Sequence, residues 1–160
     1  MTAAATRRRN IGAAEYNIAM RVLGLDVGRR RIGFAISDTL GMLARPLTTL
    51  TVSADDALDR VSTEILRIAA EEDGLEQIVV GLPRHLDGKP SPQTAAVEQF
   101  IAALRLRLPV PIATEDERLS SREAESRLAL RERDWKKRKA QLDAAAAAVI
   151  LQDYLDRQGR

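Results

Sequence analysis

Apolar residues form short blocks in the first third of the chain. One block covers 21–26, and a second at 32–38 follows a turn that carries Gly28. Two such blocks joined by a short glycine turn predict a β-hairpin. A third strand is expected at 46–52. Pro46 can open it, because the first residue of a strand need not donate to the ladder.

The spacing then changes to that of a helix. Apolar residues recur at steps of three and four, at Leu58, Val61, Ile65 and Ile68. This period predicts a helix with one apolar face, preceded by the capping sequence 53–56 and ended by Gly74. A second helix is expected over 93–106, with four residues facing inward: Val97, Phe100, Ile101 and Leu104.

A block at 77–82 lacks polar alternation and predicts a strand buried on both faces, and a short fifth strand is expected at 110–114. Ser120 is expected to cap a third helix, and a final helix is expected over 142–157. The predicted order is therefore β-β-β-α-β-α-β-α-α. Three consecutive strands followed by alternating helices and strands predict a mixed five-stranded sheet flanked by helices, an α/β fold.

Composition narrows the chemistry that this fold can carry. The 160 residues include 25 Lys+Arg and 23 Asp+Glu, so the net charge of +2 does not by itself indicate a polyanion partner. There is no cysteine, which excludes disulfides, thiolate nucleophiles and Cys-ligated zinc. The single histidine, His85, excludes a pair of imidazoles acting as acid and base. Hydrolytic chemistry would have to use carboxylates, hydroxyls, lysines or an oxygen-ligated metal.

The patterned sequence indicates one domain over 20–157. Residues 1–19 are basic at Arg7–Arg9 and lack the apolar core of a secretory signal, so we expect a disordered basic arm. No segment approaches the roughly 18 to 20 apolar residues that a membrane-spanning helix needs. We therefore expect no membrane association.

Acidic residues stand next to the ends of the predicted elements. Asp26 ends a strand, where ligands gather in open α/β sheets, although the Asp-x-Gly pattern taken alone favours a structural turn aspartate. The acids 115–117 follow another strand, or form a solvated loop. Asp143 opens an alanine-rich helix, where it could simply complement the helix dipole. Three carboxylate positions without thiols nevertheless suit Mg²⁺ or Mn²⁺, which can promote phosphodiester hydrolysis.

Basic residues flank two of these acidic positions. The first group follows Asp26 and the second precedes Asp143; the members are Arg29, Arg30 and Arg31, then Lys136, Lys137, Arg138 and Lys139. Runs of this kind are often solvated surface. Their place beside candidate metal ligands favours contacts with the phosphates of a nucleic acid.

Four motifs in order resemble the YqgF/RuvX family, and together they span residues 20–155. They are Arg21–Gly28 with Arg31–Gly33 and Ser37–Asp38; Val79–Pro83 with Asp87–Gly88; Asp116–Ser120; and Lys139–Asp143 with Ile150–Leu155. Each motif alone is weak, but four in this order are specific. The resemblance implies an RNase H-like fold related to the RuvC resolvases.

The resemblance also implies an activity and a site. The family's role is that of a nuclease acting on the 5′ end of pre-16S ribosomal RNA, in ribosome biogenesis in the bacterial cytoplasm. Its acidic positions fall on Asp26, Glu117 and Asp143, as catalytic residues and ligands of a divalent metal. Nucleic acid is the expected partner, with an RNA precursor favoured and branched DNA possible. The sequence leaves a monomer and a homodimer open.

Two other functions are compatible with the same residues. A Holliday junction resolvase would apply the same chemistry to branched DNA, as a symmetric dimer. A non-catalytic RNA-binding factor in transcription or ribosome assembly would bind RNA without metal-dependent turnover. A sugar-kinase or actin-like nucleotide binder also uses an Asp-x-Gly hairpin, but 160 residues are too few for its two lobes.

Overall fold

The computed structural model describes residues 8–11, 14–17, 20–85, 87–116 and 135–159. The strands are β1 (Arg8–Ile11), β2 (Ala14–Asn17), β3 (Arg21–Val27), β4 (Arg31–Ser37), β5 (Ala44–Thr51), β6 (Leu75–Leu82) and β7 (Ile112–Asp116). The helices are α1 (Ala57–Ala69), α2 (Pro92–Arg107) and α4 (Trp135–Arg157). The helix predicted from Ser120 lies outside the described residues.

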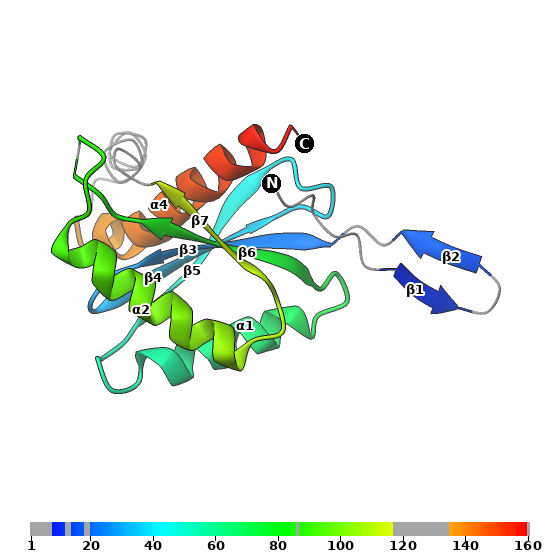
Figure 1. Ribbon diagram of the computed structural model, residues 1–160, viewed down its shortest axis with the longest axis horizontal. Helices are drawn as coiled ribbons and strands as arrows, with labels where there is room; N and C mark the ends of the chain where they lie inside the picture. The colour runs from blue at the N-terminus through cyan, green and yellow to red at the C-terminus, as the bar shows by residue number, and fades with distance from the viewer. Residues whose placement is uncertain (1–7, 12–13, 18–19, 86, 117–134, 160) are drawn as a thin grey trace.

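Five strands form the central sheet, in the order β5-β4-β3-β6-β7. Strands β3, β4 and β5 are antiparallel neighbours, whereas β6 and β7 run parallel to β3. Helix α4 covers one face of the sheet, and α1 and α2 cover the other (Figure 1). The predicted mixed sheet with helices on both faces is confirmed.

Alternate residues of the central strands supply two separate cores. On β3, Leu23 and Leu25 join the larger core beneath α1 and α2. Val22 joins the smaller core beneath α4, and a Cβ added at Gly24 would lie 2.8 Å from Cβ of Leu151 on α4. Successive residues of a strand point to opposite faces of the sheet. Leu23 and Leu25 therefore face α1 and α2, whereas Val22 and Gly24 face α4.

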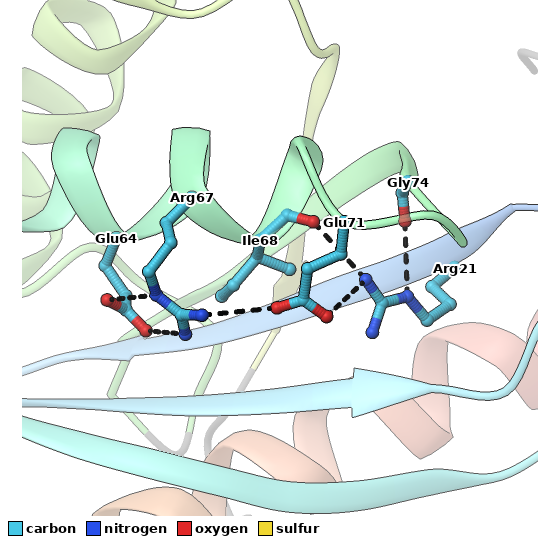
Figure 2. Close-up of polar contacts among 6 residues, drawn as sticks. All are labelled: Arg21, Glu64, Arg67, Ile68, Glu71 and Gly74. Atoms are coloured by element: carbon cyan, nitrogen blue, oxygen red, sulfur yellow. Dashed lines mark hydrogen bonds and ion pairs between the residues drawn. The ribbon is translucent and has the colours of Figure 1, made fainter.

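Arg21 joins the start of β3 to the end of α1 (Figure 2). Its guanidinium donates to the carbonyl oxygens of Ile68 and Gly74, each at 3.3 Å, and pairs with a carboxylate oxygen of Glu71 at 3.3 Å. Carbonyls in the last turn of a helix lack intrahelical donors. Arg21, which is buried, supplies donors to carbonyls at the end of α1 and just beyond it.

Several element boundaries differ from those predicted. Strand β5 begins at Ala44, so Pro46 lies inside it rather than opening it; β5 is an edge strand, and its register with β4 shifts beside Pro46. Edge strands and bulges tolerate the missing N–H of proline. Strand β7 is two residues later than predicted and contains Glu115 and Asp116. The prediction relied on apolar content alone, so it stopped before the two acidic residues at the end of the strand.

Helix α4 begins at Trp135, one to two turns before the predicted start at 142. The prediction interpreted the basic run as a connection because the apolar pattern starts only at 142. Lysine and arginine are good helix formers, so the basic run continues the helix instead of breaking it. Asp143 therefore lies in the third turn of α4, and the prediction that it opens the helix was wrong.

Strands β1 and β2 pair only with each other, as a separate antiparallel sheet (Figure 1). They fall within 1–19, where the sequence predicts a disordered arm. A two-stranded hairpin is marginal in water by itself, which is consistent with the lack of an apolar block there. No helix in the described part of the chain combines the length and apolar character needed to cross a membrane.

Candidate active site

Asp26 lies on the α4 face of the sheet, near the carboxyl end of the central strand β3. Leu25 and Val27 face the other core, so strand alternation turns Asp26 toward α4. Its Cα partner on the neighbouring strand β4 is Gly33. Asp26 is half-buried.

Gly33 is the point at which α4 comes closest to β4. A Cβ at this position would overlap the carbonyl oxygen of Asp143, so only glycine allows the helix backbone this close. Directly opposite residues on antiparallel strands have Cα atoms about 4.5–5.5 Å apart. The backbone of Asp143 therefore lies against the strand partner of Asp26, although 117 positions separate the two acids in sequence.

Arg31 connects the β3–β4 turn to this pair of acids. Its Nε donates to Oδ2 of Asp143 at 2.8 Å, and both side chains are partly exposed. The turn itself is closed by a hydrogen bond of 3.0 Å from the Gly28 amide to the Arg31 carbonyl. A Cβ at Gly28 would overlap that carbonyl oxygen, which explains the glycine after Asp26.

The third predicted acid, Glu117, lies outside the described residues. Glu115, two positions earlier, is buried and pairs with Arg157 near the end of α4. Burial raises the pKa of the Glu115 carboxyl, as do Asp153 and Asp116, while Arg157 acts in the opposite direction. Glu115 is paired with Gly81 and faces α4, so it lies at about the level of Asp26 and two strands away.

The predicted basic residues fall into two groups. Arg29 and Arg30 are exposed in the β3–β4 turn, beside Asp26. The second group belongs to the first turns of α4, before Asp143; its members are Lys136, Lys137, Arg138 and Lys139. Both groups therefore belong to backbone segments that adjoin the paired acids.

Reasoning from the sequence missed two contributors to this site. Gly33 was placed in the second strand and in a family motif but was given no role, although an isolated glycine in a strand often marks a close backbone approach. Glu115 was grouped with Asp116 and Glu117 after a predicted strand, without a role of its own. The three acidic residues are consecutive, so the sequence carries no signal that distinguishes Glu115 from the other two.

The donor atoms at this site are carboxylate oxygens, which suit hard divalent cations such as Mg²⁺ and Mn²⁺. Within the described ranges, no group of three or more Asp, Glu, His or Cys is placed to hold a metal ion. Asp26 and Asp143 are two of the three predicted ligands, and the third, Glu117, is not among the described residues. The donor chemistry thus fits a divalent cation at the two acids that the structure brings together.

Comparison with known proteins relates the chain to a family and to named relatives. Residues 20–157 match the RuvX family, described as Holliday junction resolvase. A protein of Chloroflexus aggregans named "Putative pre-16S rRNA nuclease" is 45% identical over 84% of this chain and 92% of its own length. A protein of Geobacillus thermodenitrificans with the same name is 42% identical, over 86% and 98% respectively.

Solved structures share the fold at low sequence identity. The Thermus thermophilus RuvC structure aligns with a TM-score of 0.51 at 16% identity, covering 88% of this chain and 97% of that one. The fowlpox virus resolvase, solved with Holliday junction DNA, aligns with a TM-score of 0.54 at 12% identity, covering 88% and 100%. Both similarities support the predicted RNase H-like fold.

Proposed function

The chain belongs to the RuvX Holliday junction resolvase family over residues 20–157, and on this basis we propose that it is a metal-dependent nuclease that processes the 5′ end of pre-16S ribosomal RNA in the cytoplasm. The names of relatives at 42–45% identity support this choice of substrate. A ribosomal RNA precursor would be its principal partner.

One observation carries the proposal: Gly33 brings the backbone of Asp143 onto the strand opposite Asp26. Two carboxylates from distant parts of the chain thereby share one side of the sheet. The two carboxylates of such a pair repel each other unless positive charge is present. A cation-binding site accounts for this arrangement better than a turn aspartate and a helix-dipole acid acting separately.

Asp26, Asp143 and Glu117 would hold the divalent cation, Mg²⁺ or Mn²⁺. When bound, such ions activate water and stabilise the leaving oxygen of a phosphodiester. The protein's own contribution is to fix the carboxylates on a central strand and on a helix that packs against it. The larger core beneath α1 and α2 supports β3 from the opposite face.

Substrate phosphates would contact basic residues of the two segments that border the acids. Arg29 and Arg30 extend from the β3–β4 turn, and the start of α4 carries Lys136, Lys137, Arg138 and Lys139. Phosphate contacts position a nucleic acid without reading its sequence. These residues would therefore orient the strand to be cut, and the choice of substrate would depend on the shape of the nucleic acid.

The test is cleavage of a pre-16S RNA fragment by wild type, Asp26→Asn, Asp143→Asn and Asp73→Asn proteins, with Mg²⁺, Mn²⁺ or EDTA. Asp73 is exposed in the connection before β6, at the opposite end of β3 from Asp26, and serves as the matched control. We expect Asp26→Asn and Asp143→Asn to lose at least a hundredfold in rate while remaining folded, and Asp73→Asn to keep the wild-type rate, as transition-state stabilisation by a catalytic metal implies. Cleavage by Asp26→Asn at the wild-type rate would contradict the proposed site.

The family description and the fowlpox resolvase fold favour one second candidate, cleavage of Holliday junctions. A four-way DNA junction assayed beside the RNA fragment separates the two functions by their relative rates. The remaining alternative is a non-catalytic RNA-binding factor. It would bind the RNA fragment with strong salt dependence but cleave neither substrate in any metal.

A further inference from the structure

Arg31 differs from the two arginines before it. Arg29 and Arg30 are exposed, whereas Arg31 is partly buried and its Nε lies 2.8 Å from Oδ2 of Asp143. The pair joins the first residue of β4 to the third turn of α4, across 112 positions of sequence. Arg31 thus directs its charge into the candidate site, while its neighbours direct theirs to solvent.

Asp143 also lies beside the strand partner of Asp26, so Arg31 contacts one member of a pair of like charges. Bringing two carboxylates together is unfavourable unless a cation compensates them. Arg31 supplies such a cation from within the protein. A divalent ion at Asp26 and Asp143 would supply compensation of the same kind, and it would require Oδ2 or its partner oxygen on Asp143.

We propose that Arg31 is the internal counter-ion of the site and competes with the divalent cation for the Asp143 carboxylate. This inference rests on the metal site of the proposed function. Without the cation, Arg31 holds the carboxylate and keeps α4 packed over Gly33. When the cation binds, the guanidinium gives up Asp143. Arg31 is accordingly a positioning residue that sets the metal affinity, a role different from the phosphate contact expected of the whole basic run.

The competition has a measurable size. A ligand whose site is partly occupied by a competing group binds more weakly in proportion to the occupied fraction. Partly exposed ion pairs are worth about 0.2–1 kcal/mol, which corresponds to roughly a two- to sixfold loss of metal affinity. Removing Arg31 should therefore tighten metal binding by roughly that factor beyond the general effect of losing one positive charge.

The experiment measures Mn²⁺ affinity by titration calorimetry or electron paramagnetic resonance for wild type, Arg31→Gln, Arg31→Lys and Arg30→Gln, without substrate. Arg30→Gln removes the same charge from the same turn and is the matched control. We expect Arg31→Gln to bind Mn²⁺ roughly two- to sixfold more tightly than Arg30→Gln, with Arg31→Lys between wild type and Arg31→Gln. The thermal midpoint of metal-free Arg31→Gln should fall and be restored by Mn²⁺.

Equal Mn²⁺ affinity of Arg31→Gln and Arg30→Gln, or weaker binding by Arg31→Gln, would overturn the inference while leaving the metal site intact. If Arg31→Gln does not fold, Arg31→Lys compared with wild type decides in the same way. If neither wild type nor any variant binds Mn²⁺, the result instead excludes the metal site itself, and the proposed mechanism with it. Asp143→Asn, measured alongside, identifies the carboxylate for which the two cations compete.

Discussion

The absence of a side chain at Gly33 sets the distance between β4 and α4. A methyl group there would overlap the carbonyl oxygen of Asp143, a backbone atom that cannot rotate away. Gly33→Ala should therefore push the third turn of α4 off the sheet and separate Asp143 from Asp26. We expect a loss of stability of about 1–3 kcal/mol, measured by urea unfolding, together with weakened Mn²⁺ binding. Unchanged Mn²⁺ affinity would show that the site tolerates the displacement.

Asp56, which precedes α1, provides a test at acidic pH. The Ser53 amide donates to its carboxylate at 2.7 Å, and this hydrogen bond lowers the pKa of Asp56 from its ordinary value of 3.8. A lowered folded-state pKa stabilises the protein above the unfolded pKa, and this contribution is lost as pH falls through the folded value. Asp56→Asn should be less stable than wild type at pH 7, with the difference in unfolding free energy shrinking below pH 3.8. A difference that stays constant with pH would exclude the charge as its cause.

At the same scale, the position of Asp26 could be predicted from the sequence. An acidic residue that follows an apolar block and precedes a glycine turn marks the end of a buried strand, and this local pattern does not depend on the order of strands in the sheet. The position of Asp143 was harder to predict. Its distance from Asp26 depends on the approach of α4 to Gly33, and nothing within either segment alone specifies that approach.

Among the elements, one buried arginine adds hydrogen bonds between the start of β3 and the end of α1 to the apolar packing between them. Arg21→Met keeps the length of the side chain but removes the donors to the carbonyls of Ile68 and Gly74 and to Glu71 (Figure 2). A hydrogen bond that involves a charged group contributes about 1.5–3 kcal/mol to stability. We expect Arg21→Met to lower the free energy of unfolding by about that amount in total. Chemical denaturation measures it.

Arg67 in the same cluster is the matched control, because its exposed side chain pairs with Glu64 at 2.6 Å and with Glu71 at 3.3 Å. Surface ion pairs contribute about 1 kcal/mol or less. Arg67→Met should therefore destabilise the protein less than Arg21→Met. Equal losses would mean that burial does not distinguish the two arginines.

Helix and strand boundaries could be predicted only where the apolar pattern changes. The second helix was expected over 93–106 and is observed over Pro92–Arg107, because Ser91 and Thr94 form a capping box at its start. The start of α4 was misplaced by seven residues because a lysine-rich turn resembles a linker in composition. Good helix formers without apolar residues leave no periodic signal, so such a boundary depends on tertiary context.

For the whole molecule, because β1 and β2 form a sheet of their own, we expect residues 1–19 to be dispensable for the fold. These strands share no ladder with the five-stranded sheet. A protein lacking residues 1–19 should match the full chain in thermal midpoint and in Mn²⁺ affinity, as calorimetry can measure. A drop in the midpoint of more than about 4 °C, equivalent to about 1 kcal/mol, would mean that the hairpin stabilises the domain.

The fold class could be predicted from the order of strands and helices, whereas the placement of the strands could not. The succession of three strands and then alternating elements predicts a mixed sheet. The position of β3 between β4 and β6 depends on the parallel crossover through α1, which is a property of the assembled sheet. That central position gives β3, the strand that carries Asp26, a hydrogen-bonded neighbour on each side.

The two faces of the sheet differ in the size of the core that covers them. Gly24 and Ala147 bring α4 close to the sheet over the smaller core, whereas α1 and α2 cover the larger one. Local opening of a folded protein begins where the fewest apolar contacts must be broken. Native-state hydrogen exchange should accordingly show α4 detaching as a unit before the central strands open. Asp143 would leave the site together with α4. The site is therefore complete only while α4 is packed on the sheet, and a cation that binds both carboxylates shifts this equilibrium toward the packed helix.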